Sequence, residues 1–336
     1  MFVIDRYGAA AGAMASALSG GDHIARLERA VSERTGKRAV ALNTSDAALH
    51  TALYLCGVRA GDYVVVPTFT FYSDIATVAN VGAVPVFVDC DPVTRCASAA
   101  ALETALVWAE LQNKPIAAVV IADAFGAVAD FDVLVPLCKA HGVPTVEFAS
   151  GVFGAEHGGA GCGGNCDYGV VSLGACGIGG GGAVIVSDRD DERRAREFSR
   201  QCYSDGDSFD YRPNNVVAAI DLAMLDTQKK LLARRRANLA AVCSAVDACE
   251  PTVGDGAYYA LVRCAAHAAS LRAAGFDVKT PPPVHTLPRY AECAFFEHEQ
   301  GFCASRAFDK HCLVGMDISL PKRLKLVGML KNFTAR

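Results

Sequence analysis

Asp46 and His50 are the first pair of side chains whose types and spacing suggest chemistry. Four positions apart in a helix, a carboxylate and an imidazole lie on the same face, one turn from each other. Such a pair can pass a proton to or from a bound ligand. The same pair is also a common surface or interface contact, so both interpretations stay open here.

A glycine-rich stretch carries a second group of reactive side chains: His157, Cys162, Cys166 and Cys176. A zinc knuckle would need a second matched pair of ligands, which is absent, so we predict no metal site. The thiol of Cys176 would be a nucleophile if a helix N-terminus stabilised its thiolate. The simpler interpretation is a surface loop with incidental thiols, and the sequence leaves the role of residues 162–176 open.

Two further patterns are weaker. The glycine run from Gly179 to Gly182 lacks the lysine and the spacing of a P-loop, so we interpret it as a turn before a strand. Arg234, Arg235 and Arg236 follow one another in a segment with helical character, and we predict that they form a solvated or interface face. Neither pattern favours a nucleic-acid ligand.

The elements that must position these residues alternate between the periods of strand and helix. Predicted strands are residues 38–42, 63–67, 84–89, 117–122, 143–147, 170–173 and 183–187. Predicted helices are residues 24–34, 47–56, 73–81 and 131–141. This alternation predicts an α/β fold in which a mostly parallel sheet lies between two layers of helices.

Later in the chain, residues 216–245 are predicted to form one long helix or two joined ones. We expect this helix to end a large domain of residues 1–240. The pattern then becomes mixed, with a break at Pro281-Pro282-Pro283. It predicts a smaller C-terminal α+β domain of residues 246–336.

Composition limits the classes of protein to consider. The 336 residues are 52% hydrophobic, which is ample for a large buried core, and the net charge is −4. We therefore expect a cytoplasmic protein with neither nucleic acid nor membrane as partner. Fourteen cysteines are scattered along the chain, and in apolar surroundings such as those of Cys56, Cys138 and Cys243 we predict free thiols rather than disulfides.

An ordered set of motifs carries a family resemblance. The segments are Asp46 to His50, Gly61 to Pro67, Gly82 to Asp89, Phe125-Gly126, Val143 to Ala149, Tyr211-Arg212 and Ile318 to Pro321. Together they resemble the DegT/DnrJ/StrS sugar aminotransferases, which are fold-type I pyridoxal phosphate enzymes, most clearly over residues 18–240. The resemblance implies a three-layer aminotransferase fold, a dimer, and amino transfer to a keto-sugar nucleotide.

The resemblance also implies a lysine that forms a Schiff base with the cofactor, a few residues after a serine. In this chain Ser172 is followed by Leu-Gly-Ala-Cys-Gly-Ile-Gly, and no lysine occurs between Lys139 and Lys229. Related sugar dehydratases carry a histidine instead, but the nearest upstream histidine, His157, is too far away. The family also has an aspartate beside the pyridine nitrogen, where this chain has Phe148 after Glu147.

The expected phosphate site differs as well. The family's Ser-Gly-Thr is Thr44-Ser45-Asp46 here, and Asp210 replaces an asparagine in the loop that reaches the neighbouring subunit. A carboxylate about 4 Å from a phosphate costs on the order of 4 kcal/mol at an effective dielectric near 20. Phe71 matches the family's ring-covering residue and Ser172 a phosphate-side serine, although both also suit ordinary structural roles.

From these differences we expect no cofactor, with a vestigial pocket formed by Ser45, Asp46, Phe71, Phe148 and Ser172. The expected function is that of a structural or regulatory subunit in a sugar or natural-product pathway. It would form a homodimer, or a heterodimer with an active paralogue, with Asp210, Tyr211 and Arg212 reaching across.

Two alternatives remain. One is a cofactor-independent enzyme acting on a sugar nucleotide or another small metabolite. Its candidate catalytic residues are Asp46, His50, Glu147 and Cys176. The other is a sugar-nucleotide binding module without catalysis. Whether the chain is an enzyme, and on which substrate, is left open by the sequence.

Overall fold

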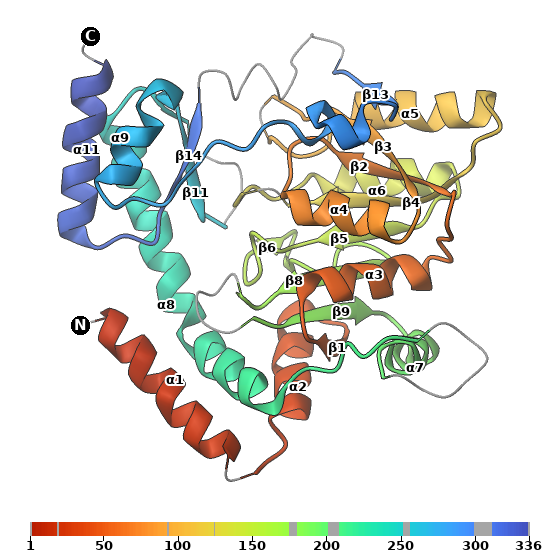
Figure 1. Ribbon diagram of the computed structural model, residues 1–336, viewed down its shortest axis with the longest axis horizontal. Coiled ribbons are helices and arrows are strands. Elements are labelled where there is room, and N and C mark those ends of the chain that lie inside the picture. Colours follow the sequence, from red (N-terminus) through yellow and green to blue (C-terminus); the bar gives the residue numbers. More distant parts are fainter. Residues whose placement is uncertain are drawn as a thin grey trace.

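The computed structural model describes residues 2–18, 20–92, 94–123, 125–174, 180–200, 208–250, 256–298 and 311–334. An eight-stranded sheet with helices on both faces forms the large domain, and a four-stranded sheet with its own helices forms the small one (Figure 1). The predicted α/β class, with a mostly parallel sheet between helices, is confirmed.

The large sheet has the order β1-β9-β8-β5-β4-β2-β3-β13. Its strands are β1 (Arg38–Leu42), β2 (Tyr63–Pro67), β3 (Val84–Val88), β4 (Ile116–Ala122), β5 (Thr145–Phe148), β8 (Tyr168–Ser172), β9 (Gly182–Val186) and β13 (Phe295–Phe296). Only β9 runs antiparallel to its neighbours, and the other pairs are parallel. The strands are runs of apolar residues because helices bury both faces.

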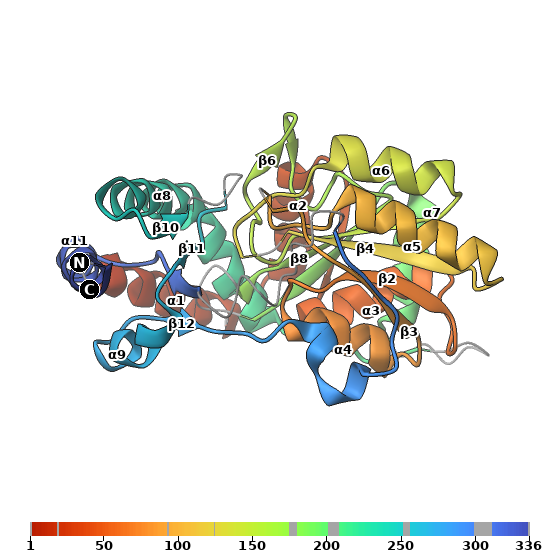
Figure 2. The same ribbon diagram turned by 90° about the horizontal axis from the view of Figure 1, so that it is seen from above.

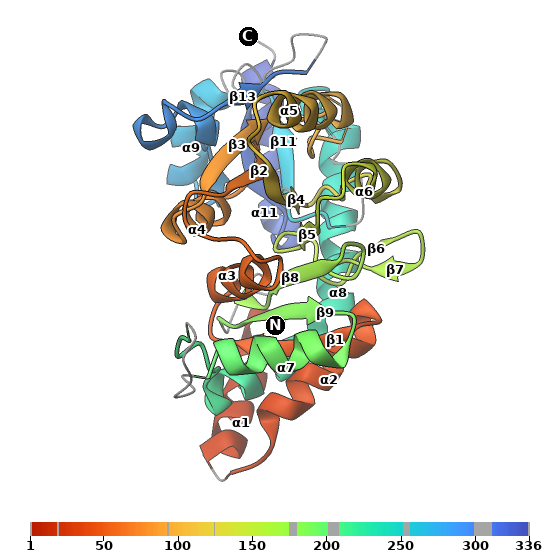
Figure 3. The same cartoon turned by 90° about the vertical axis from the view of Figure 1, so that its right-hand side faces the viewer.

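Helices lie on both faces of this sheet (Figure 3), and a separate core is packed on each face. The helices are α2 (His23–Thr35), α3 (Ser45–Leu55), α4 (Tyr72–Asn80), α5 (Ala99–Leu111), α6 (Phe131–Ala140) and α7 (Arg189–Phe198). Helices α2, α5 and α6 contribute to one core and α3, α4 and α7 to the other. Side chains of β2 alternate between them, Val65 facing the first and Val64 and Val66 the second.

Neither α5 nor the N-terminal α1 (Phe2–Leu18) has a counterpart among the predicted helices. Helix α5 is apolar almost all round, so it lacks the contrast between faces that marks an amphipathic helix. Helix α1 is rich in alanine and glycine and packs along α8 (Asn215–Ala245) (Figure 1). No described helix is long and apolar enough to span a membrane.

The small domain contains the antiparallel sheet β10-β11-β14-β12. Its elements are β10 (Cys249–Glu250), β11 (Tyr259–Val262), β12 (Val278–Lys279), β14 (Cys312–Gly315), α9 (Ala268–Ala273), α11 (Leu320–Thr334) and the 3-10 turn η2 (Ala265–His267). These elements and the C-terminal part of α8 enclose a third core. Figure 2 shows this domain beside the large one, with α8 extending into both.

Helix α8 contributes to the cores of both domains. Along α8, Met224 and Leu225 lie in the large core, whereas Leu239 and Val242 lie in the small one. Residues 284–296, which include η3 (Val284–Thr286), η4 (Pro288–Tyr290) and β13, return from the small domain to the edge of the large sheet. Periodicity shows which face of a helix is buried, but it does not show which core covers that face.

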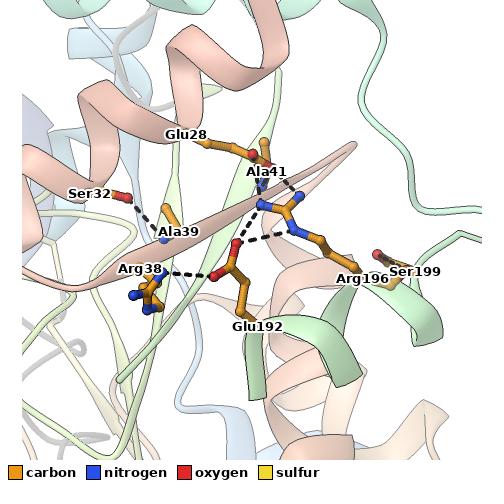
Figure 4. Close-up of polar contacts among 8 residues, drawn as sticks. All are labelled: Glu28, Ser32, Arg38, Ala39, Ala41, Glu192, Arg196 and Ser199. Carbon is orange, nitrogen blue, oxygen red and sulfur yellow. Dashed lines mark hydrogen bonds and ion pairs between the residues drawn. The ribbon is translucent and has the colours of Figure 1, made fainter. Parts of the chain in front are cut away.

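Partly buried ion pairs join α2, β1 and α7 at the other edge of the sheet (Figure 4). The guanidinium of Arg196 donates to both carboxylate oxygens of Glu28 at 2.9 Å, and also to Glu192. Glu28 accepts the backbone N–H of Ala41 at 3.0 Å, and Glu192 accepts from Arg38 at 3.1 Å. This network holds the helix α7 against the first strand and its preceding helix.

The cysteines correct two expectations. Cys243, predicted to be a free thiol, forms a disulfide with Cys249, with 4.8 Å between their Cα atoms. The thiols of Cys162 and Cys166, predicted for a surface loop, are almost fully buried. The hairpin of β6 (Glu156–His157) and β7 (Ala160–Gly161) precedes them, and the loop then folds back under β5.

Candidate functional site

A cavity of about 540 Å³ lies between the two domains, at the C-terminal ends of the parallel strands. From the large domain it is lined by Ser45, Phe71, Ser73, Phe148, Ser150, Gly151, Ser172 and Gly174. In open parallel sheets this edge is where ligands bind, because the loops after several strands converge there. Residues separated by more than a hundred positions therefore meet in one site.

Two helices begin at this cavity. Thr44 caps α3 by accepting the N–H of Ala47 at 3.0 Å, which leaves Ser45 as the first helical residue. Helix α4 begins just after Phe71. The N-terminus of a helix carries partial positive charge and outward-pointing N–H groups, so it attracts an anion such as phosphate. The hydroxyl group of Ser45 adds a donor at the same place.

Phe71 is held by aromatic neighbours from both domains. The centroid of its ring lies 4.5 Å from that of the Phe125 ring. The Phe125 ring centroid in turn lies 6.2 Å from that of Tyr259 in β11. These rings belong to a small cluster at the junction between the domains. Phe71 thus presents a fixed ring to the cavity, which suits stacking against a flat ligand.

Phe148 and Glu147 face opposite sides of β5, as the two-residue alternation predicted. Phe148 lines the cavity and is almost fully buried. Glu147 points away and accepts the N–H groups of Gly163 and Asn165 at 2.6 and 2.7 Å. Glu147 therefore anchors the cysteine loop, and the structure does not place this candidate catalytic residue in the cavity.

A second buried carboxyl group, Asp123, lies beside Glu147. Burial, followed by the charge of Glu147, raises the pKa of Asp123 well above its usual range. Burial also raises the pKa of Glu147, although its N–H donors act in the opposite direction. Because Glu147 has more hydrogen-bond donors to stabilise a charge, Asp123 is the member of the pair that is protonated more readily.

Asp46 and His50 lie on the other side of α3. They line a second cavity, of about 850 Å³, with the aromatic residues Phe198, Phe209 and Tyr211. The His50 Nδ1 atom is hydrogen-bonded to the Tyr211 hydroxyl at 2.8 Å. Burial raises the pKa of Asp46. The pair predicted for proton transfer thus lines the second cavity and not the cavity at the strand ends.

The residues expected to reach a neighbouring subunit lie close to this second cavity. Asp210 and Arg212 are exposed and form an ion pair at 2.7 and 2.8 Å, and this interaction lowers the pKa of Asp210. Tyr211 packs against Phe198 and Phe209 of its own chain. A role of these residues in contacting a partner stays a prediction. The fourth catalytic candidate, Cys176, lies outside the described residues.

The wall formed by the small domain was not predicted. It consists of Arg235, Tyr258, Tyr259, Gly275, Asp277, Gly315, Asp317, Ile318 and Lys322. Arg235 is only 4% exposed, so the prediction of a solvated or interface face is wrong for this member of the arginine run. A signal was present: Arg235 follows Leu231 and Leu232 and precedes Leu239 at the spacing of the apolar stripe of α8.

Comparison with known proteins identifies the family to which this architecture corresponds. The sequence profile of the DegT/DnrJ/EryC1/StrS aminotransferase family matches residues 8–256. The chain is 32% identical over 220 residues to EpsN of Bacillus subtilis, which is assigned as a pyridoxal phosphate-dependent aminotransferase. It is 32% identical over 226 residues to GDP-perosamine synthase of Caulobacter vibrioides.

These alignments cover 62% and 64% of this chain, and 57% and 59% of the respective relatives. The chain thus spans less than two thirds of the length of the relatives that it matches. A DegT DnrJ EryC1 StrS aminotransferase from Brucella abortus has a similar structure, with a TM-score of 0.87 at 21% identity. The structural similarity covers 98% of this chain and 96% of the other. At this level of sequence identity, it shows a shared fold.

The comparisons overturn the expectation that the protein has no cofactor, because the family normally uses pyridoxal phosphate. The structure explains the error. Asp46, expected to repel a phosphate, lines the second cavity, and Asp210 is neutralised by Arg212. Residue types aligned with a motif did not reveal which way these carboxylates point.

The cavity between the domains fits such a cofactor. Its volume is sufficient, serine hydroxyls and two helix starts can bind a phosphate, and Phe71 offers a ring for stacking. A covalent bond to the cofactor would require a lysine side chain. Of the lysines in the described part of the chain, Lys322 of α11 lines the cavity. The residues that line the cavity thus fit a cofactor that is bound through its phosphate group and its ring.

Proposed function

Since the chain belongs to the DegT/DnrJ/EryC1/StrS aminotransferase family, we propose that it is a subunit of a sugar-aminotransferase assembly. In this proposal it binds pyridoxal or pyridoxamine phosphate without a covalent bond. It works with a lysine-bearing member of the family, which completes the amino transfer. The substrate class is a keto sugar, by analogy with the family.

One observation carries the proposal. The chain has no lysine between Lys139 and Lys229, yet a cavity with phosphate-binding features lies at the ends of the strands. A site that had lost all use would not be expected to retain serines at four positions around a cavity between domains. We infer that ligand binding is retained, while the covalent step depends on another chain.

Each cavity residue then has a defined task. Ser45 and Ser172 would donate hydrogen bonds to the phosphate, and the start of α3 would add its N–H groups. Phe71 would cover one face of the cofactor ring. When bound, the cofactor supplies an electron sink for carbanion chemistry at the substrate. Phe148 excludes water from the ring and provides no charge partner for its nitrogen, which suits a subunit that does not run the whole reaction alone.

Cofactor binding is tested with the purified protein and pyridoxal phosphate, followed by fluorescence and by mass spectrometry after borohydride treatment. We expect saturable binding and no covalent mass increase. Ser172→Ala should weaken binding about tenfold through loss of a phosphate hydrogen bond. Ser244→Ala, on an exposed part of α8, is the control and should bind normally. A borohydride-fixed cofactor on any lysine of this chain would overturn the non-covalent proposal.

Pairing is tested by co-expression with a lysine-bearing family member from the same source. Native mass spectrometry should detect a heterodimer, because members of this family are typically dimers. Amino transfer by the pair should exceed that of the lysine-bearing chain alone. If only homodimers form, and the added chain leaves the rate unchanged, the subunit role is wrong even if the cofactor binds.

A further inference from the structure

Three buried side chains with metal-binding atoms meet where the loop of residues 156–166 folds back under β5. Asp123 follows the end of β4, Glu147 lies in β5, and Cys162 lies in the loop. Each of the three is at most 1% exposed. One ligand atom from each lies within 4.8 Å of those of the other two. In the described part of the chain, no other such group of three is wholly buried.

Asp123 has a carboxylate oxygen without a hydrogen-bond donor. Its Oδ1 atom accepts the N–H of Ala129 at 2.8 Å. Its buried Oδ2 atom has no hydrogen-bond partner among the residues that the structure describes. The neighbouring Glu147 offers only acceptors when it is charged, so the two carboxyl groups attract each other only through a proton or a cation between them. A buried oxygen without a donor is costly, and this arrangement therefore favours a positively charged ligand.

Glu147 is held in the way that a metal-binding carboxylate is held. Its Oε1 atom accepts the N–H of Gly163 at 2.6 Å and the side-chain amide of Asn165 at 3.1 Å, and its Oε2 atom accepts the N–H of Asn165 at 2.7 Å. Oε2 therefore retains a lone pair for a cation. Outer hydrogen bonds of this kind orient ligands in metal sites. Because the donors belong to the loop that carries Cys162, the same bonds position the thiol.

We propose that Asp123, Glu147 and Cys162 bind a structural zinc ion, which joins β4, β5 and the loop on the side of β5 opposite to Phe148. Zinc accepts carboxylate oxygen and thiolate sulfur together, whereas magnesium and calcium prefer oxygen alone. Ligand atoms in a tetrahedral zinc site are about 3.5 Å apart, so these three need only small side-chain movements. The fourth position is left for a water molecule or for the buried thiol of Cys166.

Zinc binding leaves the net charge of the buried group unchanged. Without metal, one proton between the two carboxyl groups and one proton on the thiol leave a single negative charge. A zinc ion replaces these two protons, so two carboxylates, one thiolate and two positive charges again leave one. The Lys37 ammonium group donates to the Cys166 carbonyl at 2.6 Å and thereby places a positive charge beside the loop. The exchange thus adds no buried charge.

The spacing of residues in the sequence predicted no metal site because Cys162 and Cys166 lack a second matched pair. The proposed site instead takes its other ligands from two neighbouring strands. Ile121 pairs with Glu147 in the parallel ladder of β4 and β5, so Asp123 lies two residues further on the same face. The inference goes beyond the proposed function and does not depend on it, because the site lies outside the cavity between the domains.

Metal analysis of the untagged full chain, expressed with zinc in the medium, tests the site. Mass spectrometry of the metal should find about one zinc ion per chain, and at least about tenfold less in Asp123→Asn and in Cys162→Ala. Cys138→Ala is the matched control, because Cys138 is a buried thiol of the same core outside the group. Its zinc content should equal that of the wild type. A wild type without zinc, or undiminished zinc in Asp123→Asn, would overturn the proposal.

Cobalt(II) in place of zinc reports on the thiolate. The wild type refolded with cobalt should show a thiolate-to-metal charge-transfer absorption in the near ultraviolet. Cys162→Ala should lose this absorption and Cys138→Ala should keep it. Because the wild-type spectrum requires no variant, a Cys162→Ala chain that does not fold leaves the test intact. A wild type without the absorption has no thiolate ligand, and the proposed ligand set is then wrong.

Refolding distinguishes a zinc ion from a shared proton. Asp123→Asn keeps the shape of the side chain, and its amide can donate to Glu147 in place of the proton. We expect the wild type refolded with zinc to have a higher Tm than the wild type refolded with a chelator or with magnesium, and Asp123→Asn to show no difference. If zinc leaves the wild-type Tm unchanged, the two carboxyl groups share only a proton. Neither measurement uses the cofactor, so its outcome is separate from that of the cofactor experiments.

Discussion

Asp74 shows how burial decides the charge of a single residue. It lies fully enclosed in the first turn of α4, where the hydroxyls of Thr70 and Ser73 donate to its carboxylate at 2.5 and 3.1 Å. Burial raises the pKa of Asp74 to about 7, although the two hydroxyls act in the opposite direction. Ser73 also lines the cavity, so this proton lies next to the site.

Asp74 should make stability depend on pH. The folded state retains a proton on Asp74 that the unfolded state releases near pH 4. The stabilisation that Asp74 contributes is therefore complete below that pH and is lost as pH rises toward 7. The total change is on the order of 4 kcal/mol. We expect urea unfolding to show a wild-type stability that decreases between pH 5 and pH 8. In Asp74→Asn the decrease should be smaller; equal slopes would contradict the assigned pKa.

At the scale of elements, α7 is attached to the sheet edge by charge. Arg196 bridges Glu28 of α2 and Glu192 of its own helix, with side chains that are at most a quarter exposed. Arg193, on the same helix, pairs with Asp190 and Glu197 in solvent and is 61% exposed. The two arginines therefore differ mainly in burial, which determines how much an ion pair contributes.

Replacing each arginine by methionine tests this difference. Arg196→Met leaves the largely buried Glu28 carboxylate without its charge partner, so we expect a loss of about 2 to 3 kcal/mol in the free energy of unfolding. Arg193→Met should change it by less than about 0.5 kcal/mol. Urea denaturation at low salt measures both. Equal effects would show that the network in Figure 4 does not hold α7 to the sheet.

At the scale of the whole molecule, residues 284–296 connect the two domains a second time. His285 is hydrogen-bonded through Nδ1 to the Thr68 hydroxyl, and its ring stacks on Phe295 with centroids 3.9 Å apart. Beyond it, the N–H groups of Phe87 and Asp89 donate to this segment. Helix α8, whose Arg235 lines the cavity, also extends into both domains.

His285 should make this connection sensitive to acid. Burial lowers its pKa, while the charges of Asp89 and Glu297 act in the opposite direction. A state in which residues 284–296 detach from the large sheet exposes His285, and it therefore binds more protons as pH falls through about 6.5. Detachment then becomes easier. Hydrogen exchange at the Phe87 and Asp89 amides, corrected for intrinsic rates, should be faster at pH 5.5 than at pH 7.5. His285→Phe should remove this difference; its persistence would identify another titrating group.

The sequence alone located most elements of the large domain. The spacing of apolar residues located β2 at residues 63–67 and most of the other strands. This spacing is a local signal, because the periods of strands and helices depend on neighbouring residues. The ordered motifs also indicated the family correctly. Helix α5 was missed because its apolar residues are not confined to one face.

Only the tertiary structure decided what the aligned residues do. Asp46 follows Ser45 directly in the sequence, yet the two line different cavities, since adjacent helical positions point about 100° apart. Arg235 reaches the site because α8 passes from one core to the other, and its partners Tyr258 and Asp317 come from distant segments. The local pattern determines which face is buried, whereas the surroundings of that face depend on the packing of the whole chain. For this reason the sequence indicated the fold and the family, but the direction of each charge, and the residues that meet in the cavity between the domains, were decided by the tertiary structure.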